Sequence, residues 1–196
     1  MLYYNLKRAW RKNMTLFVNA CVNEKSRTRR LAECLLSKLH GQYEEVRLHE
    51  ITFPVTDHAF LKHRDSLIEA KDFNNPMFNL ARQFAKADEI IIAAPYWDLS
   101  FPASLKQYIE QINVLGITFL YSPKGTPKGL CKAKRLTYIM TSGGTVVPED
   151  YGYGYVKALA QSYYGIPEVR LIKATGLDVD GADVESILKK TIMDAI

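Results

Sequence analysis

A continuous run of β-branched and small apolar residues, Glu89–Ala94 (EIIIAA), constrains the fold of this chain more than any other feature. The run shows no alternation of polar and apolar residues, so both faces of the strand that it predicts must be covered. Strands covered on both faces occur in parallel sheets with helices on each side. Pro95 follows at once and ends the strand, because proline has no N–H to donate to the hydrogen-bond ladder.

Four other short runs also predict strands, and stretches with helical spacing of apolar residues separate the five. We expect strands at residues 15–20, 45–49, 89–94, 136–141 and 168–173. We expect helices at residues 28–39, 57–73, 76–86, 102–114, 155–164 and 182–193. This alternation predicts an α/β three-layer sandwich, in which a five-stranded parallel sheet carries helices on both faces. Five strands favour the flavodoxin-like order 2-1-3-4-5 over the six-stranded Rossmann order.

The positive charge of the chain gathers at its N-terminus. The 196 residues carry a formal charge of +5, and residues 1–13 hold four basic side chains and no acidic one: Lys7, Arg8, Arg11 and Lys12. Subtracting these four leaves +1 for residues 14–196. We therefore expect a basic N-terminal extension (1–13) and one nearly neutral domain (14–196). A body so close to neutrality disfavours nucleic acid as a partner.

Cysteine content and hydropathy restrict the compartment. The chain has three cysteines, and this odd number argues against a disulfide framework and favours a reducing cytoplasm. No apolar run approaches the roughly 18 residues of a membrane helix, so we expect no stable membrane insertion. The N-terminus lacks the apolar core and cleavage site of a signal peptide. These features predict a cytoplasmic protein.

Three loops of the predicted sheet share one edge, beyond the carboxyl ends of the strands, where ligands bind in such folds. The loop after the first strand leads through Ser26, Arg27 and Thr28 into a helix. Unpaired backbone N–H groups and the helix dipole favour an anion there. Plain N-capping by Ser26 or Thr28 is the alternative. Two common phosphate motifs, G-x-x-x-x-G-K-[ST] and G-x-G-x-x-G, are absent.

The loop after the third strand carries two large aromatic side chains, Tyr96 and Trp97, which are suited to flank a planar ring. Ordinary packing of these two residues is the alternative. The loop after the fourth strand, residues 141–144 (TSGG), contains paired glycines that let the backbone approach a ligand closely. A simple turn is the alternative for this segment. Together the three loops predict one pocket for a flat, phosphorylated molecule.

Several short motifs of this chain resemble those of one family. They are Pro95-Tyr96-Trp97, Phe101-Pro102-Ala103, Leu105-Lys106, Gly116, Phe119, Tyr121, Gly129-Leu130 and Thr141-Ser142-Gly143-Gly144. In order and spacing they resemble the FMN-dependent NAD(P)H:quinone oxidoreductases and azoreductases, which have a flavodoxin-like fold. The similarity covers the chain from about residue 14 to the C-terminus.

The resemblance implies that FMN is the cofactor. Residues 26–28 match the family's phosphate-binding segment, residues 96–99 match the loop beside the isoalloxazine ring, and residues 142–144 match the loop at its other edge. The FMN-binding residues implied are Ser26, Arg27, Thr28, Pro95, Tyr96, Trp97, Asp98, Leu99, Thr141, Ser142, Gly143 and Gly144. Two positions depart from the family: Asp98 stands where asparagine is frequent, and the fourth loop lacks an arginine that many members carry. A carboxylate at Asp98 would disfavour an anionic reduced flavin.

The resemblance also implies the reaction. FMN carries the chemistry, passing hydride from NADH or NADPH to a small aromatic acceptor, such as a quinone or an azo compound, in a ping-pong scheme. Neither a catalytic side chain nor a metal is then required. Members of the family are homodimers with active sites at the subunit interface, and residues 119–121 and 151–155 are candidates to contribute there. For residues 151–155, where two glycines disfavour a helix, surface tyrosines on a mobile loop are the alternative.

Two other classes of protein share this fold. A flavodoxin-type electron-transfer protein binds FMN without oxidising NAD(P)H itself. Such carriers are usually strongly acidic, whereas residues 14–196 carry a charge of +1. A phospho-receiver domain needs acidic residues at the end of the first strand and an aspartate at the end of the third, where this chain has Asn19 and Pro95. The FMN oxidoreductase is therefore the preferred prediction.

Two further groups of residues allow a functional interpretation. His58 and His63, with Asp57 and Asp65 nearby, suggest a metal site. Their spacing fits no standard pair of ligands on one helix face, so a solvated surface helix is favoured. Cys21 lies beside the predicted phosphate loop, where a redox role competes with the favoured role as a small buried packing residue.

Overall fold

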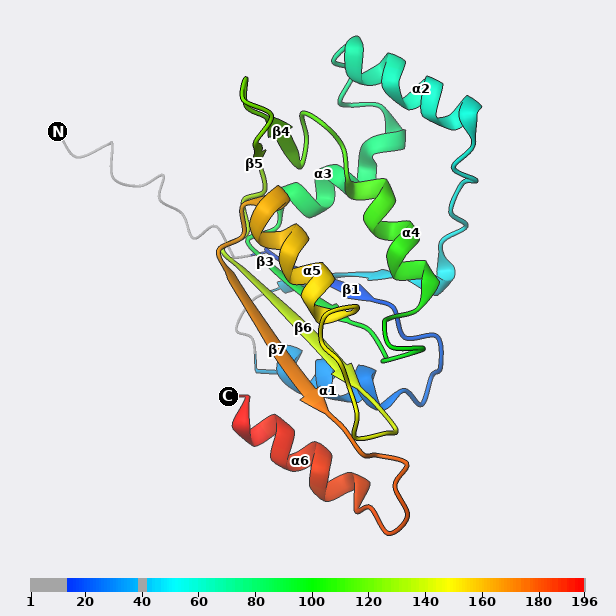
Figure 1. Cartoon of the computed structure of the whole chain (residues 1–196), viewed down its shortest axis with the longest axis vertical. Helices are drawn as coiled ribbons and strands as arrows, with labels where there is room; N and C mark the ends of the chain where they lie inside the picture. Colours follow the sequence, from blue (N-terminus) through cyan, green and yellow to red (C-terminus); the bar gives the residue numbers. More distant parts are fainter. Residues whose placement is uncertain (1–13, 39–41, 196) are drawn as a thin grey trace, which may run out of the picture.

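The computed structural model in Figure 1 describes residues 14–38 and 42–195, so the extension predicted at residues 1–13 lies outside the described residues. Five parallel strands form the central sheet, in the order β2-β1-β3-β6-β7. They are β1 (Met14–Asn19), β2 (Gln42–Arg47), β3 (Glu89–Ala93), β6 (Arg135–Thr141) and β7 (Glu168–Ala174). The predicted five-stranded parallel sheet is therefore confirmed.

The sequence pattern did not predict a second, antiparallel sheet, formed by β4 (Phe119–Tyr121) and β5 (Pro127–Gly129). This hairpin lies between β3 and β6 in the chain, which is why the labels of the main sheet skip two numbers. The helices are α1 (Arg27–Leu36), α2 (His58–Glu69), α3 (Asn79–Lys86), α4 (Ala103–Ile112), α5 (Tyr153–Leu159) and α6 (Val184–Asp194). Shorter helical turns are η1 (Leu48–Glu50), η2 (Pro76–Phe78) and the π-helical η3 (Ala160–Tyr164).

The continuous apolar run of β3 is explained by helices on both faces of the sheet (Figure 1). Successive strand residues point to opposite faces. Ile90 and Ile92 pack into a core with α3, α4 and α5, whereas Ile91 and Ala93 pack into a second core with α1 and α6. All four side chains are buried. The predicted three-layer sandwich is confirmed.

Helix α2 differs from the other helices because none of its residues is buried. It touches the body through its last turn, where Leu67 and Ile68 pack against Phe78 and Val114. The first turn is capped by Asp57, whose carboxylate accepts a hydrogen bond from the Phe60 N–H at 2.8 Å. Most of α2 therefore faces solvent.

The histidines of α2 are exposed, as expected for a solvated surface helix. His58 and His63 lie on its solvent side, and Asp65 pairs with the neighbouring Arg64 instead of with a histidine. Within residues 14–38 and 42–195, no group of three His, Cys, Asp or Glu side chains could hold a metal ion. None of the helices in this part of the chain combines the length and the apolarity needed to cross a membrane.

Two secondary-structure predictions are wrong in part. The strand expected at residues 45–49 ends at Arg47, where η1 follows. Residues 153–155 belong to α5, although their glycine suggested a non-helical loop. Glycine is favourable at position 154 because a Cβ atom would lie 3.0 Å from the Glu149 carbonyl oxygen, to which the Gly154 N–H donates a hydrogen bond. The glycine thus permits a close approach at the helix start instead of breaking the helix.

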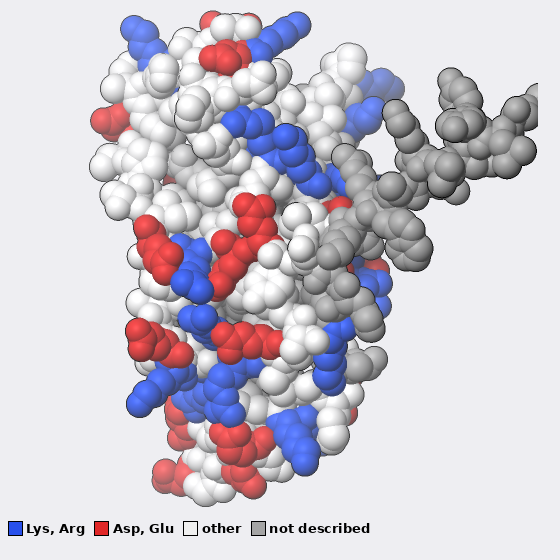
Figure 2. Space-filling view, turned by 180° about the vertical axis from the view of Figure 1, so that it is seen from behind, with Lys and Arg blue, Asp and Glu red and all other residues white. Residues whose placement is uncertain are grey.

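Charged side chains of both signs intermix over the face seen in Figure 2. Among the ion pairs of the molecule, Arg135 of β6 and Arg170 of β7 both contact Glu168 of β7, and Arg30 of α1 contacts Glu185 of α6. No single basic field covers this face, which agrees with the near neutrality of residues 14–196.

Candidate functional site

The three predicted loops meet at a cavity of about 340 Å³, at the carboxyl ends of β1, β3 and β6. This volume lies within the range of small-molecule sites, about 300–1,000 Å³. The cavity is lined by Val22, Asn23, Lys25, Ser26, Arg27, Thr28, Pro95, Tyr96, Trp97, Thr141, Ser142, Gly143 and Asp178. Nine of the twelve predicted site residues are among them, whereas Asp98, Leu99 and Gly144 are not.

The first loop supplies the start of α1. Ser26 caps the helix, since its Oγ accepts a hydrogen bond from the Arg29 N–H at 3.3 Å. The Ser26 side chain therefore acts as the N-cap of α1, which was the alternative interpretation of this residue. The N–H groups of Arg27 and Thr28 have no hydrogen-bond partner within the described ranges, so two backbone donors remain for a ligand.

Thr28 ties the first loop to the fourth. Its side chain is buried, and its hydroxyl lies 2.7 Å from that of Thr141 in a hydrogen bond. The two hydroxyls therefore satisfy each other, and their part in the site is to hold the α1 start against the end of β6. The backbone N–H groups at the α1 start are therefore the donors that remain for a ligand.

The third loop forms the aromatic wall and then turns back on itself. Trp97 and Ser100 exchange backbone hydrogen bonds of 3.2 and 2.7 Å, which closes a two-residue turn over Asp98 and Leu99. Both turn residues have positive φ angles, +49° and +66°, as in a type I′ turn. Aspartate tolerates this conformation, whereas leucine is strained by it. The turn carries Asp98 and Leu99 outward, past the cavity that Tyr96 and Trp97 line.

In the fourth loop the two glycines are not equivalent. A Cβ atom on Gly143 would lie 2.0 Å from the Asp178 Oδ2, whereas one on Gly144 would meet nothing within 4 Å. The loop is held by the chain after β7, because the N–H groups of Leu177 and Asp178 donate to the carbonyls of Ser142 and Gly143 at 3.2 and 3.0 Å. The N–H groups of Gly143 and Gly144 have no such partner among residues 14–38 and 42–195 and stay available.

Four lining residues are absent from the twelve predicted ones: Val22, Asn23 and Lys25 belong to the first loop, and the fourth is Asp178. It lies after the fifth strand, outside the three loops that fold topology singled out. Its Oδ1 accepts a hydrogen bond from the Arg27 Nη2 at 2.7 Å, and the Arg27 Nη1 donates to the Leu177 carbonyl at 2.9 Å. The acidic run Asp178-Val179-Asp180 at a strand end is the signal that could have suggested it.

Two of the side chains that line the cavity are apolar and exposed, and three more exposed apolar side chains lie in or after the third and fourth loops of the sequence. They are Val22, Trp97, Leu99, Val146 and Tyr151. The segment that carries the last two is fastened to the third loop, because the Ser100 Oγ donates to the Tyr151 carbonyl at 2.8 Å. The cavity thus combines the polar start of α1 with the exposed apolar side chains of Val22 and Trp97 at its mouth.

Cys21 packs below the cavity and does not face it. The side chain is 2% exposed, and its Sγ lies 3.7 Å from the Ala93 carbonyl. Burial raises the pKa of the Cys21 thiol to about 11, although a hydrogen bond with Ser26 opposes the rise. Since the thiolate is the reactive form, these features support the packing role of Cys21 over the redox role.

A larger cavity of about 530 Å³ lies away from the three loops, between α1, α6 and the strands β6 and β7. Its charged lining includes Arg135 and Arg170, both of which already contact Glu168. None of the twelve predicted site residues lines it. We therefore take the smaller cavity as the candidate site.

Comparisons with known proteins agree with this architecture. A family model described as "Flavodoxin-like fold" matches residues 13–195. The chain is 35% identical over 183 residues to an FMN-dependent NADH:quinone oxidoreductase of Coprothermobacter proteolyticus, covering 88% of this chain and 90% of the relative. It is 32% identical over 189 residues to a relative of the same name from Clostridium beijerinckii, covering 92% and 94%.

Solved structures show the same fold. An azoreductase of Bacillus anthracis superposes with a TM-score of 0.80 at 23% identity, over 93% of this chain and 96% of that one. An FMN-dependent NADH-azoreductase of the same species, in complex with FMN, gives a TM-score of 0.75 at 22% identity, over 93% and 97%. At these identities the likeness concerns the fold.

Proposed function

The chain belongs to the family of flavodoxin-like fold whose model it matches, and from this premise we propose that it is an FMN-dependent NADH:quinone oxidoreductase. One observation carries the proposal beyond the names of the relatives. A helix start with two unpaired N–H groups, an aromatic wall and a glycine loop with free N–H groups line or border a single cavity. Few ligands other than a flat phosphorylated molecule would use all three.

The residues present fit FMN. The N–H groups of Arg27 and Thr28 and the dipole of α1 would hold its phosphate, with Lys25 adding positive charge. Tyr96 and Trp97 would flank the ring system. The cavity is open at its mouth, where a second planar molecule could enter.

When bound, FMN supplies the redox chemistry, accepting hydride from NADH and passing the reducing equivalents to a quinone. The protein's part is to bind and orient. The N–H groups of Gly143 and Gly144 are donors that could stabilise negative charge at the edge of a bound ring. The exposed Trp97 ring offers a surface against which an aromatic substrate can stack. No nucleophilic side chain is needed for this reaction.

We include a ping-pong order in the proposal, because one apolar mouth would serve both the nicotinamide and the acceptor in turn. Initial rates measured at several quinone concentrations should then give parallel lines in a double-reciprocal plot against NADH. Converging lines would contradict this order and leave the activity itself intact. The names of the relatives favour NADH over NADPH as the reductant.

We also propose that the protein is a homodimer. A second aromatic cluster lies on the β4–β5 hairpin, where the Tyr121 ring contacts those of Phe119 and Tyr163 edge-on. Tyr121 is 49% exposed, and Leu115 and Leu130 beside the hairpin are also exposed. In a two-fold dimer one patch of each copy can cover a different patch of the other twice. The hairpin cluster would then cover the apolar mouth of the partner's cavity.

The dimer can be tested with two tyrosines of nearly equal exposure, Tyr121 at 49% and Tyr43 at 48%. Tyr121→Glu should shift the mass measured by light scattering toward the monomer, because it adds a charge to a covered apolar surface. Tyr43→Glu on β2 is the matched control and should remain dimeric. A monomeric parent protein, or a dimeric Tyr121→Glu variant, would contradict the arrangement.

The remaining parts of the proposal concern organisation. We assign residues 14–196 to one FMN-binding domain and residues 1–13 to a basic extension, and we expect neither nucleic acid nor membrane as a partner. The three cysteines are unpaired in the structure, which supports a reducing, cytoplasmic location.

The proposed activity is tested on the purified full-length chain. After addition of FMN and removal of free flavin, the protein should be yellow, and NADH should bleach it under nitrogen. With a quinone present, NADH oxidation should continue over many turnovers. A protein that binds FMN but oxidises almost no NADH would instead be a flavodoxin-type carrier. A protein that retains no flavin would contradict both.

A further inference from the structure

An ion pair is built into the wall of the candidate cavity. Arg27, at the first position of α1, donates to the Asp178 carboxylate at 2.7 Å, although 151 residues separate the two in the chain. Arg27 is held a second time through the Leu177 carbonyl, at 2.9 Å. Both residues line the cavity that would receive a phosphate, so a negative side chain stands beside the expected anion site.

The position of Asp178 is fixed by the backbone. Its N–H donates to the Gly143 carbonyl at 3.0 Å, and its carboxylate lies where a side chain on residue 143 would otherwise be. The neighbouring Gly176 N–H donates to the Gly144 carbonyl at 2.9 Å. Backbone hydrogen bonds therefore hold Asp178 against the fourth loop, while its carboxylate contacts Arg27 of the first loop.

The start of α1 explains why a carboxylate is favourable there without a ligand. The first turn of α1 contains no acidic residue but begins with Arg27, a cation at the positive end of the helix dipole. The other arginines of this turn have their own partners, because Arg29 pairs with Glu33 and Arg30 with Glu185. Asp178 supplies the missing counter-charge for Arg27.

We propose that Asp178 is an internal substitute for the cofactor phosphate: it stabilises the ligand-free α1 start and competes with the phosphate for Arg27, which lowers the affinity for FMN. The proposal rests on the proposed function, since it takes the candidate cavity as the FMN site. It assigns to Asp178 a role in setting affinity, which no comparison with other proteins supplies.

The sign of the effect follows from Coulomb's law. With Asp178 ionised, the pair Arg27–Asp178 has no net charge, and an incoming phosphate meets the helix dipole and Lys25 but only a compensated Arg27. Asp178→Asn keeps an oxygen that can accept the hydrogen bond from Arg27 and removes only the charge. An incoming phosphate then meets one more uncompensated positive charge. At the distances within one small cavity this changes affinity by about five- to tenfold.

The test compares two flavins that differ by the phosphate. We expect Asp178→Asn to lower the dissociation constant of FMN about five- to tenfold in a flavin-fluorescence titration, and to change that of riboflavin less than about twofold. Raising the salt concentration should shrink the difference for FMN, because the pair is partly exposed. Asp178→Ala provides a second variant that removes the carboxylate and its hydrogen bond together.

The matched control is Glu185→Gln. Glu185 forms the same kind of pair with Arg30, also in α1, and lies away from the cavity. This variant removes one equal charge from an ion pair of the same helix and should leave the FMN dissociation constant within about twofold of the parent protein.

Two readouts do not depend on flavin. Ligand-free Asp178→Asn should melt about 1–3 °C below the parent protein, because an exposed pair is lost. Inorganic phosphate should raise the melting temperature of this variant more than that of the parent. If the parent protein binds neither flavin, the proposed function fails, and the phosphate experiment still tests the role of Asp178.

Three results would overturn the proposal. One is an FMN dissociation constant that is unchanged or raised in a folded Asp178→Asn variant. Another is an equal gain in affinity for riboflavin, which would mean that the substitution acts by changing the shape of the cavity and not through the phosphate charge. The third is equal stabilisation of variant and parent by phosphate. A gain confined to FMN and phosphate would support the proposal.

Discussion

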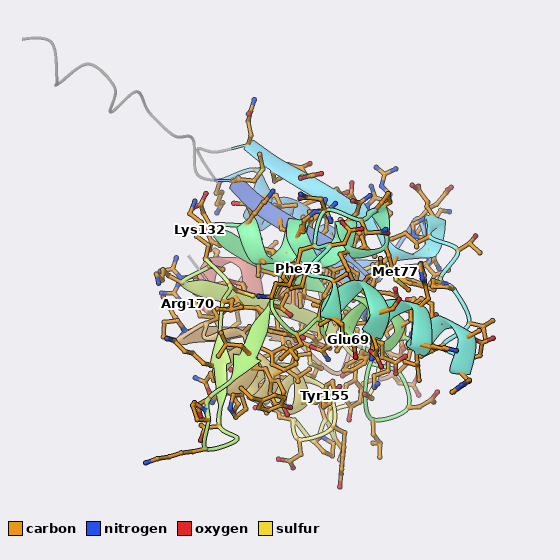
Figure 3. The ribbon with its side chains drawn as sticks, turned by 90° about the horizontal axis from the view of Figure 1, so that it is seen from above. Glu69, Phe73, Met77, Lys132, Tyr155 and Arg170 are labelled. Atoms are coloured by element: carbon orange, nitrogen blue, oxygen red, sulfur yellow. The ribbon has the colours of Figure 1, made fainter. Side chains whose placement is uncertain are left out.

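The two ends of the central sheet are built from the same strands but satisfy their polar groups differently. At the carboxyl end, unpaired N–H groups of Arg27, Thr28 and Gly143 face a cavity, and the turn at Leu99 is strained. At the amino end, Arg135 lies 2.9 Å from Glu168 and 3.7 Å from Glu89, and Lys132 pairs with Asp88. Figure 3, which views the molecule from this side, shows Lys132 and Arg170 at one margin.

This difference indicates that the carboxyl end of the sheet is suited to binding a ligand and the amino end is not. At the amino end each of these cations already has an acidic partner, so little is left for a ligand. At the carboxyl end the backbone donors are fixed in position by the sheet but lack partners, so a ligand can supply them. Changes at the carboxyl end should therefore alter binding more than stability, and changes at the amino end should do the reverse.

Among these substitutions, Ser26→Asp should have the largest effect on FMN binding. Aspartate caps a helix as well as serine does, so the free energy of unfolding should change by less than about 0.5 kcal/mol. Its charge would stand beside the expected phosphate and weaken FMN binding about 100-fold. Flavin-fluorescence titration measures the loss. Ser66→Asp, on the exposed α2, is the control and should bind FMN normally. Unchanged affinity in Ser26→Asp would remove the phosphate assignment.

Cys21 tests whether a buried thiol at the carboxyl end takes part in the reactive surface. Its pKa, raised by burial from 9.0 to about 11, lowers the thiolate fraction near neutral pH about 100-fold. Iodoacetamide should modify Cys21 in the folded protein at least about 100-fold more slowly than in urea, as followed by mass spectrometry. Modification at similar rates in both states would mean that Cys21 is accessible.

Gly143→Ala and Gly144→Ala form a matched pair within one loop. The first adds a methyl group 2.0 Å from the Asp178 Oδ2, and the second adds one in open space. We expect Gly143→Ala to cost about 1–2 kcal/mol of stability and about tenfold in FMN affinity, because the carboxylate and its loop must move. Gly144→Ala should change neither by a measurable amount. Urea unfolding and flavin titration give the two values, and equal behaviour of the variants would contradict the packing described.

Arg135→Gln should have the smallest effect, on stability alone. The side chain is 40% exposed, so loss of its two carboxylate contacts should lower the free energy of unfolding by about 0.5–1 kcal/mol. The FMN dissociation constant should stay within about twofold of the parent value. A larger change in affinity would show that the two ends are coupled, against the comparison drawn above.

The fold was largely predictable because the strongest sequence signals came from buried strands. The run at Glu89–Ala94 indicated a covered strand, and β3 is covered by helices on both faces. The hairpin of β4 and β5 was missed because strands of three residues are too short for a periodic pattern. The helix at Tyr153 was missed because the glycine at 154 permits a local contact with Glu149 that no sequence pattern displays.

The part of the site that follows from the topology of the sheet was predictable from the sequence. Three loops that a parallel sheet must bring together did line one cavity. The partners of individual side chains were not predictable, because they depend on contacts between distant segments. Thr28 pairs with Thr141, and Arg27 pairs with Asp178, across separations of 113 and 151 residues.

Because α2 has no buried side chains, it should be the first helix to unfold locally. A helix with no fully buried side chain, whose Leu67 and Ile68 are only partly buried against the body, can detach at little cost in buried area while the sheet stays intact. Amide hydrogens in the first two turns of α2 should therefore exchange with deuterium far sooner than those of β1 and β3, and limited proteolysis should cut first near residue 58. Helix α2 would then unfold locally while the remainder of the protein stays native.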